Sequence, residues 1–145
     1  MLPMFAALHF LLAFVLVSCL AVELALLSAP ADRIPFPALA KIDALYGASA
    51  GFLIAVGLYR AVYLEKGWAY YSHSGPFLLK LLLFASVALV SIYPTFHFVR
   101  ARRGNLAVAQ STVERIRLVI KIELVLVSAL IICASLAAKN VGIVT

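Results

Sequence analysis

Hydrophobic residues follow one another along this chain in four long runs, which short polar connections separate. The runs cover residues 4–28, 43–64, 76–98 and 112–138, and an α-helix needs about 20 residues to cross a bilayer. The pattern predicts an all-α integral membrane protein, with residues 1–145 forming one four-transmembrane-helix bundle. The first run is too long for the core of a signal peptide and follows no basic stretch, so we expect it to remain as a span.

Prolines and polar residues mark the predicted helix ends. Pro30 should end the first helix, and Pro76 should start the third, where its missing N–H donor costs nothing. Ser111 and Glu114 match a capping box at the start of the fourth helix. Pro94 lies near the end of the third run, and we expect it to kink the last turn of that helix.

The composition indicates that lipid is the main solvent of the chain. Of the 145 residues, 66% are hydrophobic and 12% are charged, whereas soluble domains have about 45–50% and about 25%. The net charge of +6 comes with arginines clustered beside an apolar run, which is typical of membrane orientation and not of nucleic-acid binding. Cys19 and Cys133 lie within apolar runs and outside any CxxC spacing, so we interpret them as small buried side chains.

The distribution of lysine and arginine predicts the orientation in the membrane. With four spans, both termini share one side with the second loop. The side of the first and third loops carries Arg33, Lys41, Arg100, Arg102, Arg103, Arg115 and Arg117, and the side of the termini carries Arg60, Lys66, Lys80 and Lys139. Because basic loops stay in the cytoplasm, we expect both termini outside the cytoplasm, in a bacterial inner (plasma) membrane.

Small residues in the second run have the spacing of a close helix contact. Gly47 and Gly51 are four residues apart, and this spacing lets two helix backbones approach each other in lipid. The contact could be made inside the bundle or with a second copy of the chain in a homo-oligomer.

Ionisable groups inside membrane helices are energetically costly, so each marks a candidate site. His9 and Lys80 each lie about 6 Å beyond the start of their helix, and both helices start on the outer side. The two groups should therefore lie at similar depth in the bundle. Arg60, at the outer end of the second helix, joins them, and the second loop adds His73 at the same face.

A second set of polar residues is predicted near the inner surface. It comprises Glu23, Asp43, Tyr46 and His97, with Glu123 somewhat deeper. His9 and Glu23 are fourteen residues apart, about 40° short of four full turns, and therefore share one face of the first helix. Lys80 and His97 are seventeen residues apart, or about 26 Å of helix, and cannot serve one site.

Each of these polar residues also has a purely structural interpretation. Cations near helix ends can extend toward the headgroups, and the aromatic residues of the second loop are more typical of a membrane-interface belt than of a binding platform. Asp43 can cap the second helix. Glu23 and Glu123 can be protonated, or paired with arginine or lysine, and serve packing alone.

His9 is the strongest candidate ligand. A neutral imidazole inside a membrane bundle is the usual axial ligand of haem iron, and Lys80 and Arg60 at the same level would neutralise the propionates. Few carboxylates cluster with His9, so a zinc or iron–carboxylate site fits less well. We predict b-type haem with His9 as metal ligand, and His73 as second ligand only if its loop folds inward.

The chain resembles an uncharacterised family of predicted four-helix bacterial membrane proteins. The resemblance rests on "ALHFLLAFVLVS", "KGWAYYSHSGPFLLKLLLF" and "SIYPTFHF". It covers nearly the whole chain and implies the architecture alone.

A more distant resemblance is to the HemJ-type protoporphyrinogen oxidases and the CopD-like copper-resistance domains. The HemJ-type proteins have a histidine at the start of the first helix, and a tryptophan-containing stretch before a lysine that opens a later helix. The matching positions are His9, Trp68 and Lys80. Since those proteins bind b-type haem and oxidise a porphyrinogen, the resemblance implies haem at His9. The pattern that follows their histidine is replaced by "AVELALL", so the resemblance does not extend to their reaction.

Three functions therefore stay open. The first is a haem protein with a redox or porphyrin-related role, such as a membrane oxidoreductase that exchanges electrons with quinone. The second is a non-enzymatic accessory or oligomerising subunit without a cofactor. The third is a proton-coupled or metal carrier that uses Glu23, Asp43 and Glu123, although four helices are few for alternating access.

Overall fold

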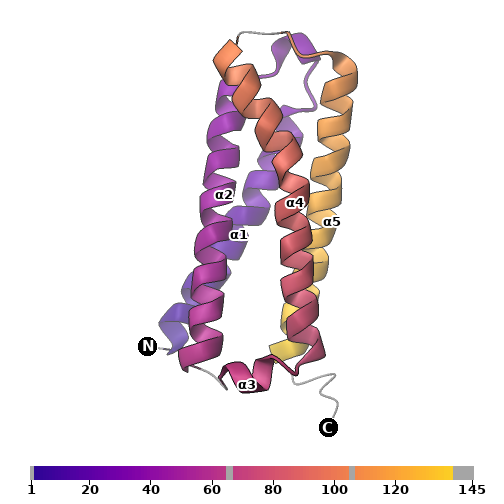
Figure 1. Ribbon diagram of the computed structural model, residues 1–145. Helices are drawn as coiled ribbons and strands as arrows, with labels where there is room; N and C mark the ends of the chain where they lie inside the picture. The colour runs from indigo at the N-terminus through magenta and orange to yellow at the C-terminus, as the bar shows by residue number, and fades with distance from the viewer. Residues whose placement is uncertain (1, 65–66, 105–106, 139–145) are drawn as a thin grey trace.

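The computed structural model describes residues 2–64, 67–104 and 107–138, and within these ranges it is helical without strands (Figure 1). The elements are α1 (Leu2–Leu26), the 3₁₀ turn η1 (Ala31–Arg33), α2 (Phe36–Tyr59), the π-helical turn η2 (Arg60–Leu64), α3 (Trp68–Tyr71), α4 (Gly75–Gly104) and α5 (Gln110–Ala138). The four long helices have the length and hydropathy of membrane spans. The predicted all-α, four-span architecture is confirmed. Lys66 and Lys139, used above for orientation, lie outside the described residues.

The four long helices run up and down in one bundle (Figure 1). The main pairs are α1 with α2 and α4 with α5, and these pairs meet where α2 packs on α4 and α1 packs on α5. The start of α1, the end of α5 and the short α3 lie at one end of the bundle, called here the α3 end. The turn η1 and the end of α4 lie at the opposite end, called the η1 end.

The tightest packing is found toward the η1 end. The largest apolar side chains without solvent exposure are Leu20, Leu27, Leu39, Phe98, Ile116 and Ile120. They lie in the halves of the helices nearest that end or, for Leu27, directly after α1. Large apolar residues such as Phe10, Phe14 and Phe52 point outward, as expected where lipid surrounds the helices. Toward the α3 end, α2 and α4 diverge (Figure 1), and this divergence makes room for a cavity.

Two helices, α2 and α4, extend by more than one turn beyond a predicted end. α2 begins at Phe36 and not at residue 43, because Pro37 in the first turn is compatible with a helix start. α4 continues through Pro94 to Gly104 and not to residue 98, because arginines favour the C-terminal turn of a helix. Asp43 is therefore a buried residue inside α2 and not its cap. Arg100, Arg102 and Arg103 therefore belong to α4 as well.

The predicted capping box is wrong. The N–H groups of Thr112 and Val113 donate to the carbonyl of Ala109, so α5 begins one residue before Ser111.

The prediction that Gly47 and Gly51 form a close helix contact is also wrong for contacts inside the bundle. A Cβ atom built on Gly47 or Gly51 meets nothing within 4 Å, and both residues are exposed on α2.

Candidate functional site

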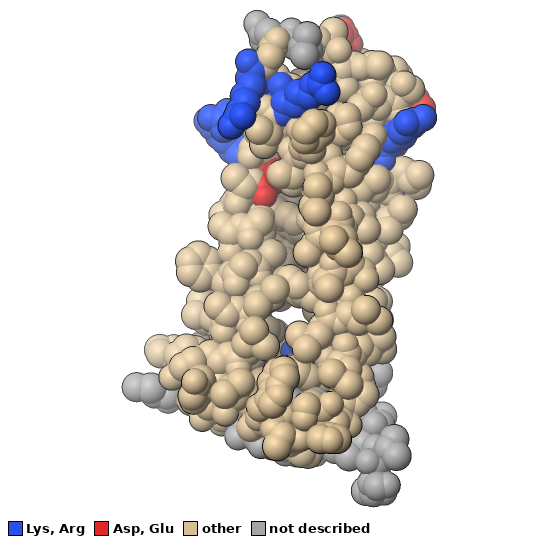
Figure 2. Space-filling view, in the orientation of Figure 1, with Lys and Arg blue, Asp and Glu red and all other residues tan. Residues whose placement is uncertain are grey.

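A cavity of about 200 Å³ lies between the helices toward the α3 end, and we call it the His9 cavity. It is lined by His9 of α1, Gly57 of α2, Phe77, Lys80 and Phe84 of α4, and Leu130 of α5. All four spanning helices therefore contribute to it. The space-filling view is hollowed between α2 and α4 in this region, with the blue of a lysine or arginine visible inside (Figure 2).

The imidazole of His9 packs against a glycine of the neighbouring helix. A Cβ atom on Gly57 would lie 3.4 Å from Cε1 and 3.8 Å from Nδ1 of His9. Both distances are ordinary van der Waals contacts, so the ring of His9 lies directly against α2 at Gly57.

Lys80 lies on another wall of the same cavity. Its Nζ atom is 5.5 Å from the centroid of the Phe77 ring, a distance at which a cation is attracted to the face of an aromatic ring. The structure thus brings together His9 and Lys80, which are far apart in the sequence. One cavity holds an imidazole and an ammonium group among mainly apolar side chains.

The other two residues expected at this site do not line the cavity. Arg60 is half-buried at the start of the π-helical turn η2, beyond the end of α2. His73 is exposed after α3, and its Nδ1 lies 3.0 Å from the carbonyl oxygen of Ala69 and 3.1 Å from Oγ of Ser72. The turn at the end of α3 therefore holds His73 away from His9.

A second polar group is buried toward the η1 end. Three carboxyl side chains, Glu23 of α1, Asp43 of α2 and Glu123 of α5, are only 1%, 5% and 1% exposed, and Tyr46 of α2 is 4% exposed. The hydroxyl of Thr95 on α4 donates to Oδ1 of Asp43 over 3.0 Å. We call these five residues the carboxyl cluster, and all four spanning helices contribute to it.

The carboxyl cluster is rich in acceptors. Glu23 lies within electrostatic range of Asp43 and Glu123, and Glu123 also lies within electrostatic range of Asp43. Oε1 of Glu23, Oε1 of Glu123 and the hydroxyl of Tyr46 are buried and have no hydrogen-bond partner among the described residues. Buried polar atoms are nearly always paired in proteins, so these three atoms mark a candidate site.

His97 does not belong to this cluster, although the sequence placed it at the same depth. Its ring packs on the rings of Tyr93 and Phe96 of its own helix, with centroids 4.6 Å and 5.7 Å apart. Thr95, by contrast, was missed. Its signal in the sequence is a hydroxyl one residue after Pro94 in an apolar helix, which does not reveal the partner.

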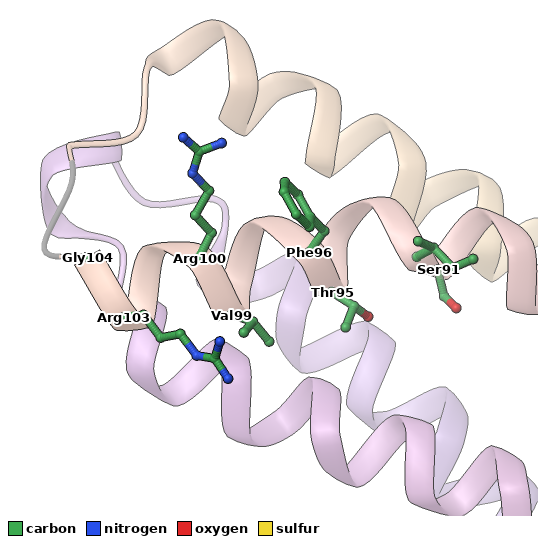
Figure 3. A pocket seen from close by; sticks show the side chains of 8 residues that line it. Ser91, Thr95, Phe96, Val99, Arg100, Arg103 and Gly104 are labelled. Carbon is green, nitrogen blue, oxygen red and sulfur yellow. The ribbon is translucent and has the colours of Figure 1, made fainter.

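A groove of about 700 Å³ runs along the face of α4 outside the bundle. Figure 3 shows Phe96 and Arg100 projecting from one edge of α4, and Thr95, Val99 and Arg103 from the other. The groove therefore extends from arginine side chains near the η1 end to the hydroxyl that contacts Asp43.

The comparison with protein families agrees with this architecture. A family model described as "Predicted membrane protein (DUF2214)" matches residues 3–142. The chain belongs to this family. Membership in the DUF2214 family and the four apolar helices place the protein in a lipid bilayer as a multi-pass protein. No curated protein and no solved structure gives a significant match.

Proposed function

We propose that this protein binds b-type haem in the His9 cavity, with His9 as an axial ligand of the iron. The observation that carries the proposal is the joint placement of His9 and Lys80 on the wall of one cavity built by four helices. The resemblance of these two positions to the HemJ-type proteins supports the same assignment.

The residues of the cavity suit the chemistry of haem. An imidazole is the commonest nitrogen ligand of haem iron, and Lys80 carries the charge opposite to that of a propionate. Phe77, Phe84 and Leu130 offer apolar surface to a macrocycle. The His9 cavity, at about 200 Å³, is smaller than typical ligand sites, which have volumes of about 300–1,000 Å³. A porphyrin would therefore also need the opening between α2 and α4 (Figure 2).

The structure supports a site with one histidine ligand. His73 is held at the α3 end by its contact with Ala69, and His97 packs on Tyr93 toward the opposite end. Arg60 does not line the cavity, so Lys80 is the proposed propionate partner. When bound, haem would supply one-electron redox chemistry, and the apolar side chains that line the cavity would limit the access of water. We infer a redox or porphyrin-related role with quinone or porphyrin as a membrane-soluble partner.

An absorption spectrum tests the proposal. Detergent-purified protein titrated with haemin should develop a Soret band, and dithionite should produce the sharp bands of a reduced b-type haem. His9→Ala should lose these features. The chain has three histidines, so His73→Ala and His97→Ala are matched controls that should keep them. Wild-type protein without a Soret band, or a His9→Ala spectrum equal to that of the wild type, would contradict haem binding.

A second candidate function is that of a non-enzymatic subunit that associates through α2. Gly47 and Gly51 are exposed there, and a Cβ atom built on either glycine meets nothing within 4 Å. The missing side chains would let a helix of a second copy of the chain approach closely. Gly51→Ile should abolish chemical crosslinking into dimers in native membranes, whereas Ala21→Ile, at an exposed site on α1, should not. Equal crosslinking in both variants would exclude this interface.

We also propose the orientation. Lysine and arginine gather at the η1 end of the face in Figure 2, and basic segments stay in the cytoplasm. The η1 end would then face the cytoplasm, and the α3 end with the His9 cavity would lie on the outer side of a bacterial inner membrane.

A further inference from the structure

We propose that the carboxyl cluster is a proton-binding site, in which Glu23 and Glu123 carry exchangeable protons and Asp43 remains the hydrogen-bonded anion. The site is independent of haem binding. Glu23 and His9 are fourteen residues apart on α1, or about 21 Å along the helix. Neither of the two proposals therefore requires the other.

The charge of the cluster is the first argument. Three carboxylates would place three negative charges in a membrane interior, within electrostatic range of one another. Charges removed from water are very costly unless they are paired. Among the described residues no lysine or arginine forms an ion pair with Glu23, Asp43 or Glu123. Protons are the simplest positive charges that can fill this need.

The hydrogen bonds give a second argument, which does not depend on the charges. A carboxylate can only accept hydrogen bonds, whereas a carboxylic acid also donates one. Asp43 already accepts from Thr95, but the buried Oε1 atoms of Glu23 and Glu123 have no donor. A proton on each glutamate would give the cluster donors as well as acceptors. Asp43, which has its donor, is the member best suited to remain charged.

The neighbours on each packed helix do not change this assignment. Cys19 of α1 and Tyr46 of α2 lie within electrostatic range, and both are neutral in their protonated forms. α4 contributes the neutral Thr95. Lys121 of α5, two residues from Glu123 in the sequence, is exposed. Arg117, six residues from Glu123 on the same helix, donates from its guanidinium to the carbonyl oxygen of Leu27.

Thr95 supplies a route to the surface. It lines the groove on α4 that ends beside Arg100 and Arg103 (Figure 3), and it also donates to Asp43. A hydroxyl can accept a proton from the groove while it donates its own to the carboxylate, so that no charge remains on the threonine. Asp43 would then pass this proton to Glu23 or Glu123 and return to its anionic form.

The geometry favours protons over a metal ion. Among the described residues, no group of three histidine, cysteine, aspartate or glutamate side chains has an arrangement that could hold a metal ion. A proton needs only one carboxyl oxygen and a neighbouring acceptor, and the cluster offers both.

Infrared difference spectroscopy of the full-length protein in lipid vesicles tests the equilibrium. At neutral pH the wild type should show the carbonyl stretch of buried protonated carboxyl groups, which shifts to lower frequency in D₂O. Glu23→Gln and Glu123→Gln should each remove part of this band, and the double variant should remove it. Glu114→Gln, which changes an exposed residue on α5, should leave the band unchanged, as should His9→Ala.

The absence of the band in the wild type, or its persistence in the double variant with unchanged helical circular dichroism, would overturn the proposal. Loss of the band on adding sodium, calcium or zinc at constant pH would instead identify a metal site and overturn it too. The route has its own test. Thr95→Val should slow deuterium exchange of the band at least several-fold and Thr95→Ser should restore it, whereas unchanged exchange in Thr95→Val would exclude this path.

Discussion

Gly57 of α2 faces the imidazole of His9 on α1 so closely that a Cβ atom on the glycine would lie 3.4 Å from Cε1 of the ring. This distance is an ordinary van der Waals contact for a methyl group. Gly57 also lines the His9 cavity, so a longer side chain at this position would compete with the imidazole and with any ligand for the same space.

We predict that Gly57→Leu lowers haem affinity at least about tenfold, which corresponds to about 1.4 kcal/mol. The leucine would fill the cavity and displace the imidazole, whereas Gly57→Ala should keep most of the affinity. The measurement is a haemin titration followed in the Soret region. Gly47→Leu is the matched control, because Gly47 lies exposed on the same helix. Equal affinities of Gly57→Leu and the control would show that the cavity does not bind haem.

Lys80→Met should weaken haem binding by about 1.5–3 kcal/mol, the contribution of a hydrogen bond to a charged group. The proposed partner of Lys80 is a propionate, so the effect should vanish when haem dimethyl ester, which has no carboxylate, is the ligand. Lys41→Met, at an exposed site near the η1 end, should bind both ligands like the wild type. If Lys80→Met weakened binding of the ester equally, its role would be packing and not charge.

Thr95→Val should destabilise the fold by about 1.5–3 kcal/mol, because the carboxyl group of Asp43 would lose the donor of a 3.0 Å hydrogen bond. Thermal unfolding in detergent measures this loss. Thr95→Ser should recover most of the stability. Ser86→Ala on the same helix removes only a bond to the carbonyl of Leu82, so it should change the stability much less than Thr95→Val does.

The orientation can be measured with single cysteines in a variant that lacks Cys19 and Cys133. His73→Cys at the α3 end should react with a membrane-impermeant maleimide on intact cells, and Asp32→Cys in η1 should react only after permeabilisation. Both parent residues are exposed, so the accessibility of the side chain does not limit either reaction. The reverse pattern would place the η1 end outside and overturn the orientation.

The sequence by itself determined the number of spans and the level along the bundle that His9 and Lys80 share. These are properties along one dimension, because the thickness of the bilayer sets the length of a span and each helical residue advances by about 1.5 Å. The sequence therefore assigns His9 and Lys80 to one level, and Glu23 and Asp43 to another, with Glu123 somewhat deeper.

Only the tertiary structure decided which faces of the helices meet. Lipid and protein interior are both apolar, so a membrane helix that is hydrophobic all round does not reveal which of its sides points inward. The structure alone therefore reveals that Gly57 and not Gly47 packs against another helix. It also reveals that Thr95 and not His97 belongs to the carboxyl cluster, and that Lys80 shares a cavity with His9 while His73 does not.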